Sequence, residues 1–221
     1  MLTFSLNKKN VLMLTGLLMA AVQVAQAQYD QKAKTVLDAM SSKYKQIPAF
    51  NAKYSYQLES KAEGISQNFS GEIMVKNDMY VIKTEEQEIF NNGRTVWIYL
   101  KSDNEVTIMP FEPEPDEILP GDVPDMYKSG FKYAYLGEKT IEGKVYELID
   151  LNPEDRNAAF YKVSLVISKD DKTIRSWQMF NRSGRIYTYT LRNFTPLKTI
   201  SDTAFAFDTT KHPKVLVIDN R

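Results

Sequence analysis

Alternation of apolar and polar side chains, repeated along most of the chain, is the feature that most limits how this sequence can fold. In residues 50–58 every even-numbered side chain is apolar or aromatic, and every odd-numbered one is polar. Successive side chains of a strand point to opposite faces, so this pattern predicts a strand with one buried face. Further strands are predicted for residues 67–76, 79–83, 95–100, 105–109, 131–137, 145–151, 161–168, 174–181 and 185–194, with a short last strand around Phe205 and Phe207.

Short turns separate these segments, and they predict how the strands connect. Asn91, Asn92 and Gly93 are one such turn signal, because Asn and Gly tolerate the positive φ that tight hairpins require. About ten or eleven sequential strands with short connections indicate an antiparallel meander rather than a parallel α/β sheet. We therefore expect a mainly β (α+β) fold.

Two segments depart from the strand pattern. Residues 30–44 have apolar side chains at three- and four-residue spacing, which predicts a helix with one apolar face, and Pro48 prevents its continuation. Residues 111–130 contain four prolines among acidic side chains, with no second apolar core beside them. We expect this segment to be a long excursion within one domain, either functional or partly helical.

The first 27 residues have the features of a signal peptide. Lys8 and Lys9 form a basic region, residues 11–24 are mostly apolar, and Ala25 and Ala27 occupy the two positions that signal peptidase reads. We expect cleavage near Ala27, between it and the following glutamine, which leaves residues 28–221 as a single domain. An uncleaved N-terminal anchor is the alternative. The chain has no cysteine on which a bacterial lipoprotein could carry its lipid, so we expect an exported protein that is free in solution.

Side chains suited to catalysis are scarce. His212 is the only histidine, and cysteine is absent, which leaves little for a nucleophilic triad or a soft metal site. No phosphate loop, nucleophile elbow or H-E-x-x-H motif occurs. We expect no enzyme, no metal and no cofactor, with His212 as an ordinary surface residue. Carboxylates such as Glu72, Glu88 or Glu147 could still meet across strands as in a glycosidase.

Charge and aromatic content narrow the class of partner. The formal net charge is zero, whereas binding to nucleic acid requires clustered positive charge, so nucleic acid is not an expected partner. The 13 tyrosines, 11 phenylalanines and 2 tryptophans are spread over nearly every predicted strand. They either fill an ordinary core or line a space that the chain leaves partly empty for an apolar ligand. Composition does not choose between these two interpretations.

Several blocks of the sequence, taken in order, resemble the outer-membrane lipoprotein carrier family, the LolA-type periplasmic chaperones. The first is the predicted helix followed by YKQIPAFNAKY at residues 44–54, and the next is GEIMVK at residues 71–76. The most specific is NGRTVWIY at residues 92–99, which is similar to the family's "dGktlW.Y" hairpin. Near the end, SDTAFAF at residues 201–207, His212-Pro213 and VID at residues 217–219 are similar to the closing segment of the family.

The resemblance implies an open antiparallel half-barrel sheet, covered by helices, that encloses a hydrophobic cavity. It also implies a periplasmic carrier, without a cofactor, that accepts lipoproteins by their acyl chains. The donor would be an inner-membrane lipoprotein-releasing transporter, and an outer-membrane acceptor would receive the cargo; a monomer is expected. The residues expected to line the cavity come from one face of each strand: Tyr54, Tyr56, Leu58, Ile73, Val75, Tyr80, Ile82, Trp97, Tyr99, Met109, Tyr187 and Tyr189.

One position departs from the family pattern. In well-known members an arginine follows the "vk" strand and helps to hold the helical lid shut, but here Lys76 is followed by Asn77 and Asp78. We expect any lid to be held differently or loosely. Lys76 or Lys83 could substitute for the arginine, but no feature of the sequence assigns this role to either of them. The resemblance places the lid in residues 111–130.

Three other functions stay open at this point. The first is an envelope sensor that binds lipid or mislocalised lipoproteins, although such sensors tend to have two domains. The second is a hydrolase with cross-strand carboxylates, and the third is a structural adhesin module.

Overall fold

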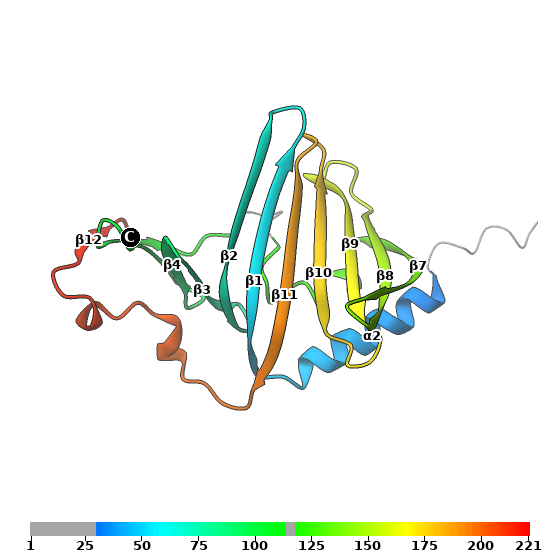
Figure 1. The fold of residues 1–221 in the computed structure, drawn as a ribbon, viewed down its shortest axis with the longest axis horizontal. Coiled ribbons are helices and arrows are strands. Elements are labelled where there is room, and N and C mark those ends of the chain that lie inside the picture. Colours follow the sequence, from blue (N-terminus) through cyan, green and yellow to red (C-terminus); the bar gives the residue numbers. More distant parts are fainter. Residues whose placement is uncertain (1–29, 114–117) are drawn as a thin grey trace, which may run out of the picture.

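The computed structural model describes residues 30–113 and 118–221, and the predicted signal peptide (residues 1–27) lies outside them. Within these residues, twelve strands form one open sheet in the order β12-β6-β5-β4-β3-β2-β1-β11-β10-β9-β8-β7 (Figure 1). The only parallel neighbours in this described sheet are β12 and β6. The predicted open antiparallel sheet is therefore confirmed. The strands are β1 (Ala49–Ser60), β2 (Ile65–Lys76), β3 (Met79–Thr84), β4 (Gln87–Asn91), β5 (Thr95–Leu100), β6 (Glu105–Pro110), β7 (Phe131–Ile141), β8 (Lys144–Pro153), β9 (Phe160–Ser168), β10 (Ile174–Asn181), β11 (Ile186–Leu197) and β12 (Leu216–Asp219).

The sheet consists of two meanders joined along β1 and β11. Strands β1 to β6 pair in sequence order, β7 to β11 do the same, and β11 then pairs with β1. The predicted hairpin turn between β4 and β5 is confirmed. The Asn91 side chain accepts a hydrogen bond from the Gly93 N–H at 2.7 Å, and Gly93 has a φ of 81°. Glycine adopts this left-handed conformation without the steric cost that a Cβ would bring.

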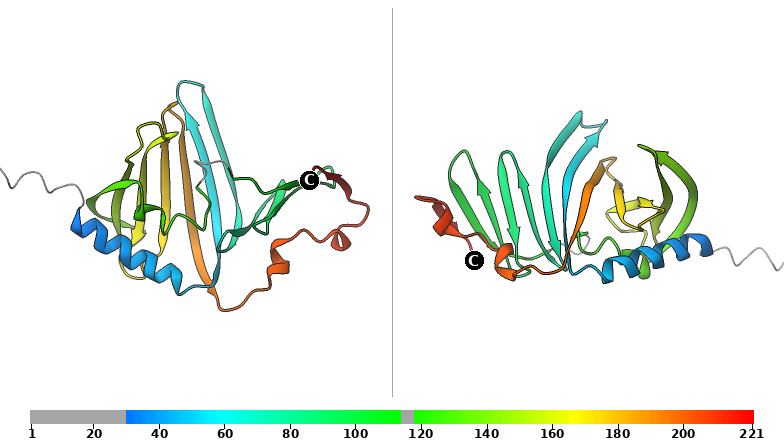
Figure 2. Two further views of the ribbon diagram at one scale, coloured as in Figure 1. Left: turned by 180° about the vertical axis from the view of Figure 1, so that it is seen from behind. Right: turned by 60° about the horizontal axis from the view of Figure 1, so that its bottom comes forward.

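Helix α2 (Gln31–Lys45) covers one face of the sheet, here called the inner face, and the opposite face is the outer face. Asp30 caps the helix by accepting hydrogen bonds from the N–H groups of Lys32 and Ala33. Its second carboxylate oxygen accepts from the Tyr135 N–H of β7 at 2.9 Å, which ties the start of the helix to the edge of the sheet. Leu37 and Met40 are fully buried against the strands, as the predicted apolar face requires. Figure 2 shows the helix crossing one end of a curved sheet.

Strands β6 and β7 lie near opposite edges of the sheet, and the described residues of the crossover between them cover part of the inner face. Residues 118–130 contribute the buried side chains Leu119, Val123 and Tyr127, of which the last two belong to the core that α2 forms with the sheet. The regular structure in this described part is a single short 3-10 turn, η2 (Met126–Lys128). The prolines explain why no longer helix forms there.

The C-terminal residues pack on the outer face. Phe205 and Phe207 are buried against β3 to β6, in a second apolar cluster separate from the inner core. The short strand predicted around these two phenylalanines is wrong, because Phe205 ends the 3-10 turn η3 (Asp202–Phe205). A further 3-10 turn, η4 (Thr209–Lys211), leads to β12, which extends the sheet beside β6. None of the helices in the described residues is long and apolar enough to cross a bilayer.

Candidate functional site

A group of aromatic rings lies on the inner face, away from the end of the sheet that α2 covers. Strand β1 is buried at Phe50 and Ala52, but its next inner side chains, those of Tyr54, Tyr56 and Leu58, are only half-buried. The Tyr189 ring stacks on the Trp177 ring with centroids 4.7 Å apart and an interplanar angle of 7°. The same Tyr189 ring lies 5.3 Å from the Tyr56 ring and 6.4 Å from the Tyr54 ring. These rings form a partly exposed wall contributed by β1, β10 and β11.

Strand pairing shows where each predicted cavity residue lies. Directly paired residues of neighbouring strands share a face, and most of the predicted set falls on the inner face. Among the inner-face members, Ile73 and Val75 are buried, and the others are half-buried. The inner-face members are Tyr54, Tyr56, Leu58, Ile73, Val75, Tyr80, Ile82, Met109, Tyr187 and Tyr189.

The other two residues predicted for the cavity, Trp97 and Tyr99, lie on the outer face, so the prediction is wrong for them. Trp97 is paired with Phe90 and with Ile108, both of which belong to the outer cluster. The Tyr99 ring packs on the Phe207 ring with centroids 5.1 Å apart. Strand β5 is apolar on both faces, so alternation alone does not reveal which side chains face inward. The C-terminal segment decides this by covering the outer face.

Sequence reasoning missed two inner-face residues of β10. Trp177 is paired with Tyr189, and Met179 is paired with Tyr187, so both point to the aromatic wall. The signal was present in the sequence, since positions 177 and 179 alternate with polar Ser176 and Gln178. Strands β10 and β11 are adjacent in the predicted meander, so residues of β10 that pair with Tyr187 and Tyr189 could also have been predicted to face inward.

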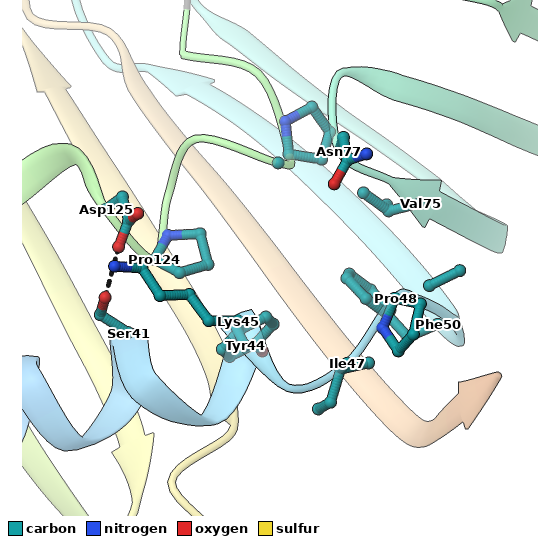
Figure 3. A pocket seen from close by; sticks show the side chains of 13 residues that line it. Ser41, Tyr44, Lys45, Ile47, Pro48, Phe50, Val75, Asn77, Pro124 and Asp125 are labelled. Carbon is teal, nitrogen blue, oxygen red and sulfur yellow. Dashed lines mark hydrogen bonds between the residues drawn. The ribbon is translucent and has the colours of Figure 1, made fainter. Parts of the chain in front are cut away.

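The described crossover, residues 118–130, is joined to α2 by two side-chain hydrogen bonds. The Ser41 hydroxyl donates to the Asp125 carboxylate (Figure 3). The Tyr127 hydroxyl donates to the Asp38 carboxylate at 2.6 Å. Burial and the adjacent Asp38 charge raise the pKa of the Tyr127 hydroxyl, so this donor keeps its proton at physiological pH. These contacts hold the crossover against the helix.

A pocket opens along the line where the crossover meets the end of α2 and the turn between β2 and β3. Its volume is about 170 Å³, and apolar side chains such as Ile47, Phe50 and Val75 line it beside Asn77 (Figure 3). Pockets that hold a drug-sized ligand are roughly 300–1,000 Å³. This pocket alone is therefore too small for an acyl chain, which would need the partly exposed wall as well.

The proposed substitutes for the family's lid arginine have other partners. Lys76 donates to the Ile200 carbonyl and forms an ion pair with Asp202 at 2.6 Å, which ties it to the C-terminal segment on the outer face. Lys83 pairs with Glu88 at 3.1 Å. Neither lysine reaches the described residues of the crossover through these bonds.

The carboxylates considered for hydrolysis do not converge. Glu88 lies between Lys83 and Lys101 on the outer face, at 3.1 and 3.5 Å. Glu147 is buried on β8, where it pairs with Lys172 at 2.7 Å. Glu72 is exposed on β2. In the described part of the chain no group of three His, Asp or Glu side chains could hold a metal ion.

His212 differs from the expected surface residue, because its ring packs between two aromatic side chains. Its ring centroid lies 4.5 Å from that of Tyr99 and 4.5 Å from that of Phe207. It is half-buried. Its contacts therefore belong to the packing of the C-terminal segment on the outer face.

Comparison with known proteins supports this fold and gives the family. An uncharacterized conserved protein from Thermus thermophilus superposes with a TM-score of 0.55 at 12% identity, over 86% of this chain and 100% of that one. A LolA superfamily protein from Nitrosomonas europaea gives a TM-score of 0.41 at 13% identity, over 80% of this chain and 98% of that one. The lipoprotein LppX of Mycobacterium tuberculosis gives a TM-score of 0.46 at 10% identity, over 76% of this chain and 98% of that one. At these identities the Thermus structure supports the fold alone.

The comparison by sequence is more specific. No curated protein matches the chain. The family model described as outer membrane lipoprotein carrier protein LolA matches residues 45–208, which include nearly all of the sheet and the partly exposed aromatic wall. Because this match covers most of the chain, the protein belongs to the LolA outer membrane lipoprotein carrier family.

Proposed function

We propose that this protein is a periplasmic carrier that binds the acyl chains of lipoproteins on its inner face and moves them from the inner to the outer membrane. The observation that supports this function is the partly exposed apolar wall on the inner face. Tyr54, Tyr56, Leu58, Tyr187 and Tyr189 stay half-buried there, while the outer side of the neighbouring strands is polar at residues such as Ser55, Gln57 and Thr190.

The energetics of acyl chains explain why such a wall is useful. Taking a lipid anchor out of a membrane costs roughly 0.8 kcal/mol for each methylene that becomes exposed to water. A carrier offsets this cost by giving the chains apolar surface of its own. Aromatic and methionine side chains suit this role, since flat rings and flexible thioethers adapt to chains of different shape.

The remaining parts of the proposal follow from the family. A releasing transporter in the inner membrane would supply the lipoprotein, and an acceptor at the outer membrane would take it. The carrier would act as a monomer in the periplasm after removal of residues 1–27, without a cofactor and without enzymatic activity. Residues 28–221 would act as one domain.

Adjacent residues on opposite faces of β1 give a matched test. Tyr56 and Gln57 are both half-buried, but Tyr56 points to the inner face and Gln57 to the outer face. We expect Tyr56→Asp to abolish the uptake of a lipoprotein from vesicles, because it places a charge on the acyl-binding wall. Gln57→Asp should leave uptake unchanged. Circular dichroism confirms that both variants are folded, and normal uptake by folded Tyr56→Asp would refute the proposal.

Native mass spectrometry of protein purified from the periplasm tests the cargo directly. We expect a fraction of the molecules to carry an intact lipidated protein, and this fraction to disappear in Tyr56→Asp. Protein that consistently carries no lipidated cargo, in cells that make lipoproteins, would contradict carriage.

A further inference from the structure

Two buried side-chain donors in the described part of the chain have no hydrogen-bond partner, and both lie on the inner face. They are the Asn91 side-chain amide nitrogen and the Trp177 indole nitrogen. The Asn91 side chain already serves the hairpin turn, where its oxygen accepts from the Gly93 N–H. Trp177 has no such local role, and only 3% of its surface is exposed.

Trp177 lies directly beside the partly exposed aromatic wall. Its ring stacks on the Tyr189 ring, which in turn contacts the Tyr54 and Tyr56 rings. The half-buried Tyr54 side chain, with its phenol hydroxyl, belongs to the same group of rings. Burial, with the neighbouring tyrosines, raises the pKa of Tyr54, so this hydroxyl remains a proton donor. A buried indole N–H without a partner and a phenol hydroxyl therefore belong to the same group of rings.

The unpaired indole N–H of Trp177 limits which ligand the wall can bind favourably. A buried N–H without an acceptor destabilises a protein, so such groups in native structures call for an explanation. A hydrocarbon chain offers no acceptor and would leave the indole N–H unpaired. A ligand that satisfies both donors must bring oxygen atoms into the apolar wall.

The charge around this wall indicates which oxygen atoms these are. The cation nearest along the strand to Tyr187 is Arg185, and it is already occupied by a bidentate ion pair with Glu63, at 2.7 and 2.8 Å. Arg185 is therefore not free to pair with a phosphate at this wall. Neutral donors such as an indole N–H and a phenol O–H suit a neutral acceptor, and the neutral acceptor of an acyl lipid is its ester carbonyl.

We propose that Trp177 and Tyr54 donate hydrogen bonds to the ester carbonyls of a bound acyl lipid, so that the site prefers ester-linked chains to ether-linked chains of equal length. This inference rests on the proposed function, because it concerns the ligand of the same wall. It assigns Trp177 and Tyr54 a role in specificity, while the surrounding rings and aliphatic side chains supply the affinity for the alkyl chains.

The experiment compares dipalmitoylglycerol with its dihexadecyl ether counterpart, each supplied from phosphatidylcholine vesicles of the same composition. Binding is followed by the emission of Trp177 in a Trp97→Phe background, and by the amount of labelled lipid extracted. We expect the ester lipid to bind about tenfold more tightly, which corresponds to about 1.4 kcal/mol. Trp177→Phe and Tyr54→Phe, measured by extraction, should each bring the ratio of the two affinities close to one.

Trp97→Phe is the matched control, because Trp97 lies on the outer face and its loss should leave the ratio unchanged. Tyr54→Phe removes a single oxygen atom, so it keeps the test valid if Trp177→Phe fails to fold. Equal binding of the two lipids by the unmodified protein would overturn this inference and leave the carrier function intact. Failure to bind either lipid would overturn both.

Discussion

Gly121 lies so close to the backbone of Asn77 that a Cβ on this glycine would be 2.1 Å from the Asn77 carbonyl oxygen. This contact places the crossover against the turn between β2 and β3. In this protein the turn meets the crossover through its backbone. The hydrogen bonds of Asp125 and Tyr127 to α2 then fix the remainder of residues 118–130.

Gly121→Ala is expected to displace the crossover from this turn. Backbone atoms surround the new methyl group and have little freedom to move, so we expect a loss of about 1–3 kcal/mol in the free energy of unfolding. Hydrogen exchange should increase in residues 118–130 relative to the sheet. Ser129→Ala, an exposed position in the same segment, is the control. Unchanged exchange in Gly121→Ala would show that the close contact does not hold the crossover.

Tyr127→Phe is expected to weaken the attachment of the crossover to α2. It removes the hydrogen bond to the Asp38 carboxylate and leaves the buried ring in place, at a cost of about 1–2 kcal/mol. A double-mutant cycle with Asp38→Ala in urea unfolding measures the coupling between the two residues. Tyr161→Phe on β9, where the ring is exposed, should have no effect. A coupling energy near zero would refute this role for the pair.

Asp30 should make the stability of the protein depend on pH in the acidic range. The Tyr135 N–H, followed by the N–H groups of Ala33 and Lys32, lowers the pKa of Asp30 below its ordinary value of 3.8. The folded state therefore binds this proton less readily than the unfolded state. Its stabilisation is complete above the ordinary pKa and is lost as the pH falls through the lowered one.

The matching variant is Asp30→Asn, whose side chain does not titrate but can still cap the helix. From pH 5 to about pH 3 we expect the unmodified protein to lose more stability than Asp30→Asn in urea unfolding. Asp30→Ala removes the cap entirely and should cost about 1–2 kcal/mol at neutral pH. Asp103→Asn, an exposed turn residue, is the control. Identical pH profiles for the protein and Asp30→Asn would contradict this prediction.

Phe205→Ala should release the C-terminal segment from the outer face. Phe205 is fully buried in the outer cluster, and truncation of such a phenylalanine costs about 3–5 kcal/mol. Fluorescence of Trp97, recorded in a Trp177→Phe background, reports the exposure of this face. Lys198→Ala, an exposed position of the same segment, should leave both the stability and the emission unchanged. A stable Phe205→Ala variant with unaltered emission would show that the segment is held by other contacts.

Much of the architecture could be predicted from the sequence, because local patterns carry it. The three- and four-residue spacing predicted the helix, and period-two alternation predicted most strands close to their observed bounds. Strand β4 was missed, since Gln87 and Glu88 interrupt its apolar pattern. Strand β12 was missed as well, because a four-residue segment shows little alternation and its pairing with β6 is parallel and distant in sequence.

By itself, the sequence determined which residues form strands, where the chain turns, and that its aromatic side chains alternate along these strands. The tertiary structure decided which side of the sheet each apolar row occupies. Alternation shows which side chains of a strand share a face, but it does not show which face is the inner one. On β5 both faces are apolar, so Trp97 and Tyr99 were predicted on the inner face although they lie on the outer face. Only the folded chain brings residues 198–211 to the outer face and α2 to the inner face. Neither α2 nor residues 198–211 extends over the part of the inner face where the rings of Tyr54, Tyr56 and Tyr189 lie, so these rings stay partly exposed.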